Sequence, residues 1–162
     1  MYSLEVLENS IFQAEDFDER IVLGEGRHYY VLKNEIPYCQ VIADPNHLHM
    51  EGIIFKDYLV IASDEMVLFI SLINLTVKEK VKPQYYVSKF IVADDVLYIL
   101  DCTGIIAISS ELDMLWENHD LAVDGVIATN FAEGDVMEIS CEMDPPGGWI
   151  DRRISKKDGK II

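Results

Sequence analysis

The chain has 162 residues and a formal net charge of −16 at pH 7, and half of its residues are apolar. This composition excludes a disordered chain, and a chain of this length buries roughly 70% of its unfolded surface. The longest strongly apolar stretch, Met66–Leu75, is about half as long as a membrane-spanning helix, so no membrane association is predicted.

The charge is concentrated in the second half of the chain. Between Lys89 and Arg152 there is no Lys or Arg, whereas this stretch contains fourteen Asp and Glu residues. Nucleic acid is a poor partner for such a surface, because its affinity for proteins depends on cationic groups. A basic protein is favoured instead, since complementary fields speed association.

Two further features predict a cytoplasmic location. The first residues, MYSLEVLENSIF, include two glutamates and no basic residue, so they do not resemble a signal peptide. The three cysteines, Cys39, Cys102 and Cys141, are widely spaced and form no CxxC motif. We therefore expect buried free thiols in a reducing compartment.

Short hydrophobic segments bounded by turn residues follow one another along the chain. One window, Ser10–Glu19, has helical periodicity and precedes these segments. The density of the hydrophobic segments and their content of β-branched and aromatic residues predict an all-β fold. Pro37 predicts that the strand around Tyr38 lies at a sheet edge. In chain order the predicted strands are Tyr29–Leu32, Cys39–Ala43, Gly52–Phe55, Tyr58–Ala62, Met66–Leu72, Phe90–Ala93, Val96–Leu100, Ile105–Ile108, Gly125–Ala128, Val136–Cys141, Trp149–Arg153 and Lys160–Ile162.

The strands repeat. EGII at Glu51 recurs as DGVI at Asp124, and SKFI at Ser88 lies midway between them. Each copy continues with two hydrophobic strands and a more polar fourth segment, TVKEKV, MLWENH or KKDGKII. A period of about 36–38 residues with four short strands is typical of propeller blades. Such meanders stack, because one alone cannot bury its apolar face.

The stretch LYILDCTGIIAISSELDMLW, residues 97–116, resembles a blade of the PQQ-like and WD40-like β-propeller class. In the PQQ-like pattern a tight Asp/Gly turn joins two inner strands and a Trp follows the outer turn, and Asp101, Gly104 and Trp116 match these places. The resemblance covers about residues 51–162. It implies blade-like antiparallel meanders in a partial or small propeller-like array, with a compact β-barrel or sandwich of the same hairpins as the alternative.

We predict one all-β domain over residues 1–162. It comprises an irregular N-terminal unit, 1–50, and blade-like repeats at 51–87, 88–123 and 124–162. The resembled class holds its quinone in a complete ring, which this chain is too short to build, so no cofactor is expected.

No catalytic or metal-binding residue is predicted. His47 and His49 would share one face of an extended segment, but two histidines without a third ligand do not define a metal site. Paired carboxylates such as Asp94 and Asp95 are typical of solvated turns. No nucleophile motif occurs, and Gly24-Glu25-Gly26 lacks the third glycine of a dinucleotide site.

These features predict a non-catalytic protein-binding domain whose acidic β surface binds a basic protein, for example as an immunity or antitoxin-type inhibitor. Loop Asp144–Gly148 and the following Trp149 either form a recognition platform or merely turn the chain. The predicted partner-binding residues are Glu111, Asp113, Trp116, Glu117, Asp120, Asp124, Glu133, Asp135, Asp144 and Trp149.

Two alternatives remain open. A small ligand-binding domain or hydrolase would place its site where the blade loops converge, with His49, Asp94, Asp124 and Glu133 as the first acids or bases to test. A structural subunit would pair its edge strands with another copy, so both a monomer and a symmetric dimer are compatible with the sequence.

Overall fold

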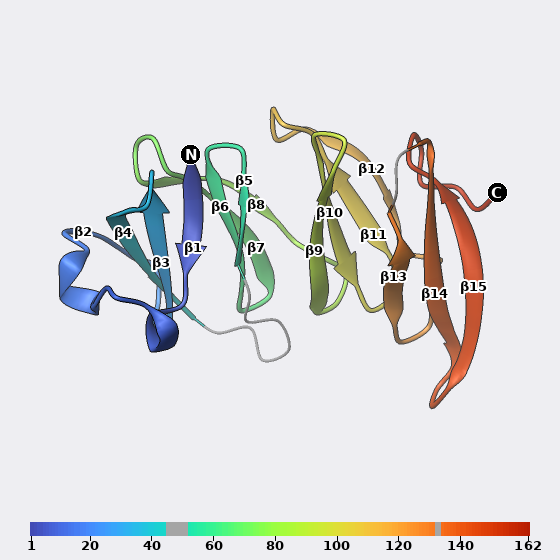
Figure 1. Ribbon diagram of the computed structural model, residues 1–162. Coiled ribbons are helices and arrows are strands. Elements are labelled where there is room, and N and C mark those ends of the chain that lie inside the picture. Colours follow the sequence, from blue (N-terminus) through green and yellow to red (C-terminus); the bar gives the residue numbers. More distant parts are fainter. Residues whose placement is uncertain (45–51, 132–133) are drawn as a thin grey trace. The chain divides into compact units, whose positions relative to one another are not determined.

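The computed structural model describes residues 1–44, 52–131 and 134–162, which fold into four small β-sheets, here called A to D (Figure 1). Two short 3₁₀ helices, η1 (Leu7–Asn9) and η2 (Ala14–Asp16), are the helical elements of these residues. None of the described helices is long and apolar enough to cross a membrane. The all-β prediction is confirmed, and the predicted helical window contains only η2.

The described residues form two compact units, 1–82 and 83–162. Sheets A and B belong to the first unit, and sheets C and D belong to the second. The expectation of a single domain stays a prediction.

Sheet A has the strand order β1-β3-β4-β2, with β2 parallel to β4 and the other pairs antiparallel. Its strands are β1 (Tyr2–Glu5), β2 (Glu19–Val22), β3 (Arg27–Lys33) and β4 (Ile36–Ala43). The strand with Pro37 is therefore interior, and the edge prediction was wrong for the strand as a whole. Locally the proline is tolerated because β2 pairs only with Cys39–Ile42, which leaves Pro37 without a neighbour on that side.

Sheet B is an antiparallel meander in chain order. It consists of β5 (Gly52–Phe55), β6 (Tyr58–Ser63), β7 (Met66–Ser71) and β8 (Thr76–Val81). Alternate residues of sheets A and B form the core of the first unit, to which Val31, Cys39, Val41, Leu59, Ile61 and Ile70 each contribute a fully buried side chain.

Sheet C repeats the four-stranded meander, and sheet D has three strands. Sheet C consists of β9 (Val87–Ala93), β10 (Val96–Asp101), β11 (Ile105–Ile108) and β12 (Met114–Asn118). Sheet D consists of β13 (Val126–Asn130), β14 (Val136–Asp144) and β15 (Gly148–Ser155). The predicted last strand, Lys160–Ile162, is reduced to a single bridge between Ile154 and Ile161.

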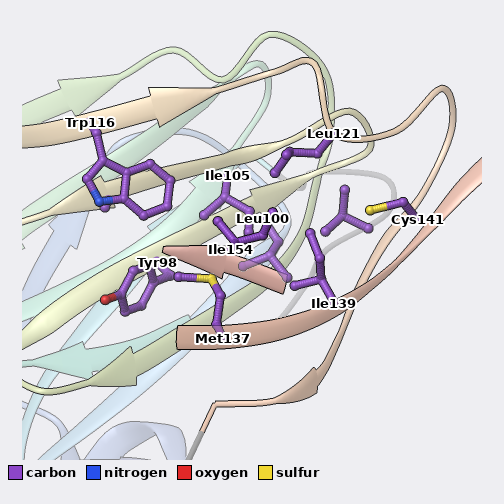
Figure 2. Packing of buried hydrophobic residues seen from close by; sticks show 11 residues of the cluster. Tyr98, Leu100, Ile105, Trp116, Leu121, Met137, Ile139, Cys141 and Ile154 are labelled. Atoms are coloured by element: carbon purple, nitrogen blue, oxygen red, sulfur yellow. The ribbon is translucent and has the colours of Figure 1, made fainter. Parts of the chain in front are cut away.

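The core of the second unit lies between sheets C and D (Figure 2). Tyr98, Leu100 and Ile105 come from sheet C, and Met137 and Ile139 come from sheet D. All five are almost completely buried. A fully buried side chain of this size contributes about 1.5–3 kcal/mol, so this interface stabilises the unit and holds the turns of both sheets in place.

Candidate functional site

The turns of the second unit gather at two opposite ends, because successive antiparallel strands run in opposite directions (Figure 1). One end, called here the β10–β11 end, comprises segments 102–104, 119–125 and 145–147. The opposite end, called the β9–β10 end, comprises segments 94–95, 109–113 and 156–159 and the described residues of the β13–β14 turn, 131 and 134–135.

The structure divides the predicted partner-binding residues between these ends. At the β10–β11 end lie the exposed residues Asp120, Asp124, Asp144 and Trp149, and Glu117 is exposed on β12 next to that end. At the β9–β10 end lie the exposed residues Glu111, Asp113 and Asp135. Glu133 falls outside the described residues, as do His47 and His49. The predicted residues therefore form two groups rather than one surface.

The two ends differ in charge. At the β9–β10 end, Lys156 Nζ lies 2.7 Å from Asp94 Oδ2, and Lys157 adds a second cation. The three segments of the β10–β11 end contain Asp120 and Asp124 but no Lys or Arg. The excess of negative charge is therefore most one-sided at the β10–β11 end.

Asp101 organises the β10–β11 end from inside. Its side chain is completely buried, and Oδ1 accepts hydrogen bonds from Thr103 N at 2.9 Å, Thr103 Oγ1 at 3.1 Å and Gly104 N at 2.7 Å. Oδ2 accepts one from Gln84 N at 3.1 Å. His119 Nδ1 lies 3.2 Å from the same Oδ2, at ion-pair distance for a protonated imidazole but outside hydrogen-bond geometry. A buried carboxylate is tolerated here because donors surround it.

The turn that Asp101 shapes also holds the connection to sheet D. Thr103 O accepts hydrogen bonds from Leu121 N at 3.1 Å and Ala122 N at 3.0 Å. A Cβ at Gly104 would overlap the carbonyl oxygen of Asn118, so only glycine allows this close approach. Asp101 and Gly104 matched the family pattern in the sequence. The contribution of His119 was missed, because a histidine far from Asp101 in the sequence carries no local signal.

The two tryptophans have opposite environments. Trp116 is buried in the core, where its ring lies 6.0 Å from that of Tyr98 and its Nε1 donates a hydrogen bond to Lys156 O at 2.8 Å. Trp149 is 42% exposed and lies on the outer face of sheet D. A Cβ placed on Gly125 would be 3.0 Å from Trp149 Cη2, so the indole reaches over the strand between them and covers this glycine.

The cysteines are buried free thiols, as the sequence predicts. Burial, with a smaller contribution from Glu19, raises the pKa of Cys39 to about 12, and burial followed by Asp101 raises the pKa of Cys102 to about 11. Burial also raises the pKa of Cys141. Thiols with such pKa values are almost fully protonated at neutral pH and are poor nucleophiles.

Within the described ranges, no group of three or more His, Cys, Asp or Glu side chains is arranged to hold a metal ion. Asp94, one of the alternative catalytic candidates, lines a hollow together with Tyr98, Asp135 and Lys156. Burial, with Asp94 as the smaller cause, raises the pKa of Tyr98 to about 12. This shift is opposite to the one that a general base working near neutral pH needs.

No family model matches the sequence, and no curated protein matches it. Solved structures do resemble the fold. KlHsv2 with loop 6CD replaced by a Gly-Ser linker aligns with a TM-score of 0.58 at 12% identity, over 83% of this chain and 44% of that chain. The WD40 domain of Pan2 from Neurospora crassa aligns with a TM-score of 0.55 at 7% identity, over 84% and 45%. BamB from Moraxella catarrhalis aligns with a TM-score of 0.55 at 15% identity, over 90% and 50%.

These likenesses concern the fold alone. They show that the chain has the fold of the WD40-like and PQQ-like β-propeller class, as the blade resemblance in the sequence implies. The chain spans about half the length of the structures it matches. The described residues form four separate sheets of three or four strands, as the blades of this class do, rather than one continuous barrel sheet.

Proposed function

We propose that this chain is a non-catalytic, cytoplasmic protein-binding domain that holds a basic protein partner against the acidic β10–β11 end of its second unit. The observation that carries the proposal is the one-sided charge of this end, where Glu117, Asp120, Asp124 and Asp144 are exposed on segments without a basic residue. A field of one sign attracts an oppositely charged protein and raises its association rate.

The fold supports this proposal. The core between sheets C and D fixes the strands, and the hydrogen bonds of Asp101 fix the turn beside the acidic segment. The exposed carboxylates are therefore presented on a rigid framework, which lowers the entropy cost of binding. An immunity or antitoxin-type inhibitor that covers the cationic site of a toxin would use such a surface directly.

The test is affinity capture from native lysate at low salt, followed by stepwise elution with salt and mass spectrometry. We expect one stoichiometric basic protein that moderate salt releases, because exposed ion pairs are screened by salt. A variant with Glu117→Gln, Asp120→Asn and Asp124→Asn should lose most of the captured protein.

The matched control removes the same charge from the first unit. Glu8, Glu15 and Asp18 are exposed there, and their replacement by Gln, Gln and Asn should leave capture unchanged. Equal losses of captured protein in both variants would mean that the total net charge, and not the position of the carboxylates, determines binding. Capture of an acidic protein, or of none by the folded chain, would overturn the proposal.

A further inference from the structure

The face of sheet A that points away from sheet B carries a connected group of polar side chains. We call it the outer face of sheet A. Arg20 of β2 and Tyr30 of β3 both pair in register with Gln40 of β4, so these three residues form one row across the sheet. His28 lies two residues before Tyr30 and therefore on the same face.

Gln40 holds this group together from a buried position. Gln40 is only 1% exposed, and its Oε1 accepts a hydrogen bond from Arg20 Nε at 3.0 Å. Its Nε2 lies 2.7 Å from His28 Nδ1 and donates to Tyr30 Oη at 3.3 Å. Tyr30 packs in turn against Phe17, a buried residue of the segment between β1 and β2, with the ring centroids 5.1 Å apart. The group is therefore ordered by contacts within this chain.

The donors fix the direction of each bond in the group. A guanidinium can only donate, so Oε1 of Gln40 faces Arg20 and its amide nitrogen faces His28. His28 Nδ1 therefore accepts, and the neutral imidazole carries its proton on Nε2. Both Arg20 and His28 are exposed, so their outer N–H groups are accessible. Among the described residues no carboxylate, Asp18 of the same segment included, forms an ion pair with Arg20.

The surroundings of these donors favour a carboxylate as the ligand. One guanidinium balances one negative charge, whereas a phosphate carries up to two onto a chain whose net charge is already −16. Glu19 pairs in register with Cys39 and so belongs to the opposite face, and Glu5 on β1 is three strand positions, about 14 Å, from β2. Two residues beyond Arg20, Val22 is 64% exposed on the same face and offers an apolar contact.

We propose that Arg20 and His28 bind a carboxylate on the outer face of sheet A, namely the C-terminal carboxylate of a peptide whose last side chain rests on Val22. Arg20 donates from its guanidinium and His28 donates from Nε2, and the carboxylate oxygens accept. Gln40 is a positioning residue, because it orients both donors before the ligand arrives and so lowers the entropy cost of binding. This site belongs to the first unit and is independent of the proposed function.

The probe is acetyl-valyl-leucine with a free carboxylate, and its C-terminal amide is the control for charge. Binding to the full chain is followed by nitrogen NMR, through the Arg20 Nε–H signal and the ring nitrogens of His28. We expect the acid to shift the signals of both side chains and the amide to bind at least about tenfold more weakly. Inorganic phosphate should also bind more weakly than the acid. In the free protein the neutral His28 ring should show its proton on Nε2.

Three variants separate the roles of the residues. Arg20→Gln should raise the Kd for the acid at least about tenfold. Lys78→Gln removes a charge from an exposed position on β8 of the same unit and should leave the Kd unchanged. Gln40→Met keeps the size of the side chain without its polar atoms, and we expect the Kd to rise about fivefold although Arg20 and His28 are both present. The proton of His28 should then no longer be confined to Nε2, an effect that a purely structural role of Gln40 would not produce.

Equal Kd values for the acid and the amide, or for Arg20→Gln and Lys78→Gln, would overturn the proposal. It would also be overturned by an acid that does not bind the wild type, by tighter binding of phosphate, or by a wild-type His28 ring with its proton on Nδ1. If Gln40→Met fails to fold, the comparison of Arg20→Gln with Lys78→Gln decides, because both positions are exposed. Capture of a basic protein is measured separately, so the failure of this site and the failure of the proposed function are distinguishable.

Discussion

Asp101 is a buried acceptor that stabilises the turn through the donors it satisfies. Four hydrogen bonds from Gln84, Thr103 and Gly104 end on its two oxygens. Replacing a buried acceptor leaves each of these donors without a partner away from water, which costs more than the bond itself contributes. Asp101 is therefore expected to matter for stability far more than any exposed aspartate of the same unit.

We expect Asp101→Ala to lower the free energy of unfolding by about 3 kcal/mol. The matched control is Asp113→Ala in an exposed turn, where the change should be within about 0.5 kcal/mol. Urea unfolding followed by circular dichroism measures both. Similar values for the two variants would show that the buried hydrogen bonds contribute little.

The buried tyrosine and thiols predict instability in alkaline solution. Burial raises the pKa of Tyr98 from 10.0 to about 12 and that of Cys102 from 9.0 to about 11. The folded state therefore keeps both groups neutral at a pH where the unfolded chain ionises them. Stability is fully present below about pH 9 and falls as the pH rises towards 11 and 12.

Urea unfolding at a series of pH values from about 8 to 11 tests this expectation. The free energy of unfolding of the wild type should fall steadily above about pH 9. Tyr98→Phe and Cys102→Ala should each fall less steeply, even where they are less stable at neutral pH. A wild-type curve that stays flat to pH 11 would contradict the prediction.

The two tryptophans show where the sequence could not predict the environment of a single residue. Both follow a turn at the start of an outer strand, and for each of them a core position and a surface position were compatible with the pattern. The structure buries Trp116 and exposes Trp149. The difference depends on what lies against each side chain: residues 156–159 lie against Trp116, whereas the face of sheet D around Trp149 is open.

At the scale of elements, Gly104 is the point where two backbone segments come closest. An added Cβ would overlap Asn118 O, a backbone atom held by the β11–β12 ladder. Gly104→Ala is therefore expected to lower the free energy of unfolding by about 3 kcal/mol, at the upper end of the cost of overpacking. At Gly52 the nearest atoms are side-chain carbons 3.1–3.2 Å away, which can shift. Gly52→Ala should cost about 1 kcal/mol in the same urea titration, and a reversed order would contradict this account.

Most strands could be predicted from the sequence because they are hydrophobic and end at turn residues. Gly52–Phe55 and Ile105–Ile108 were predicted with their observed bounds. Strands β1 and β2 were missed because they are short and partly exposed, and β2 also depends on parallel pairing with a strand twenty residues away in register. Long-range pairing of this kind leaves no periodic signal in the sequence.

The fourth strand of sheet D shows the opposite error. Lys160–Ile162 has the composition of a strand, but in the structure it forms a single bridge, between Ile161 and Ile154 of β15. Repetition predicted four complete strands in each blade.

At the scale of the whole molecule, the acidity of the chain was evident from the sequence, but its arrangement was not. The predicted partner-binding residues are close in the sequence, yet antiparallel strands send consecutive turns to opposite ends of the second unit. Lysines 156 and 157 return to one of these ends and offset its charge. Only strand direction, which requires the sheet topology, distinguishes the mixed end from the acidic one.

This arrangement predicts how salt acts on association with the captured basic partner. The Debye length falls from about 30 Å at 0.01 M salt to about 10 Å at 0.1 M, so salt shortens the range over which the acidic end attracts a cation. We expect the association rate, measured by stopped flow, to fall about tenfold over this range, with a smaller change in the dissociation rate. The triple variant at Glu117, Asp120 and Asp124 should show a reduced rate and a weaker salt dependence. The variant at Glu8, Glu15 and Asp18 carries the same net charge as the triple variant. Comparing the two variants therefore separates the effect of the local field from that of the total charge. Identical salt dependences of their association rates would mean that the β10–β11 end does not steer the partner.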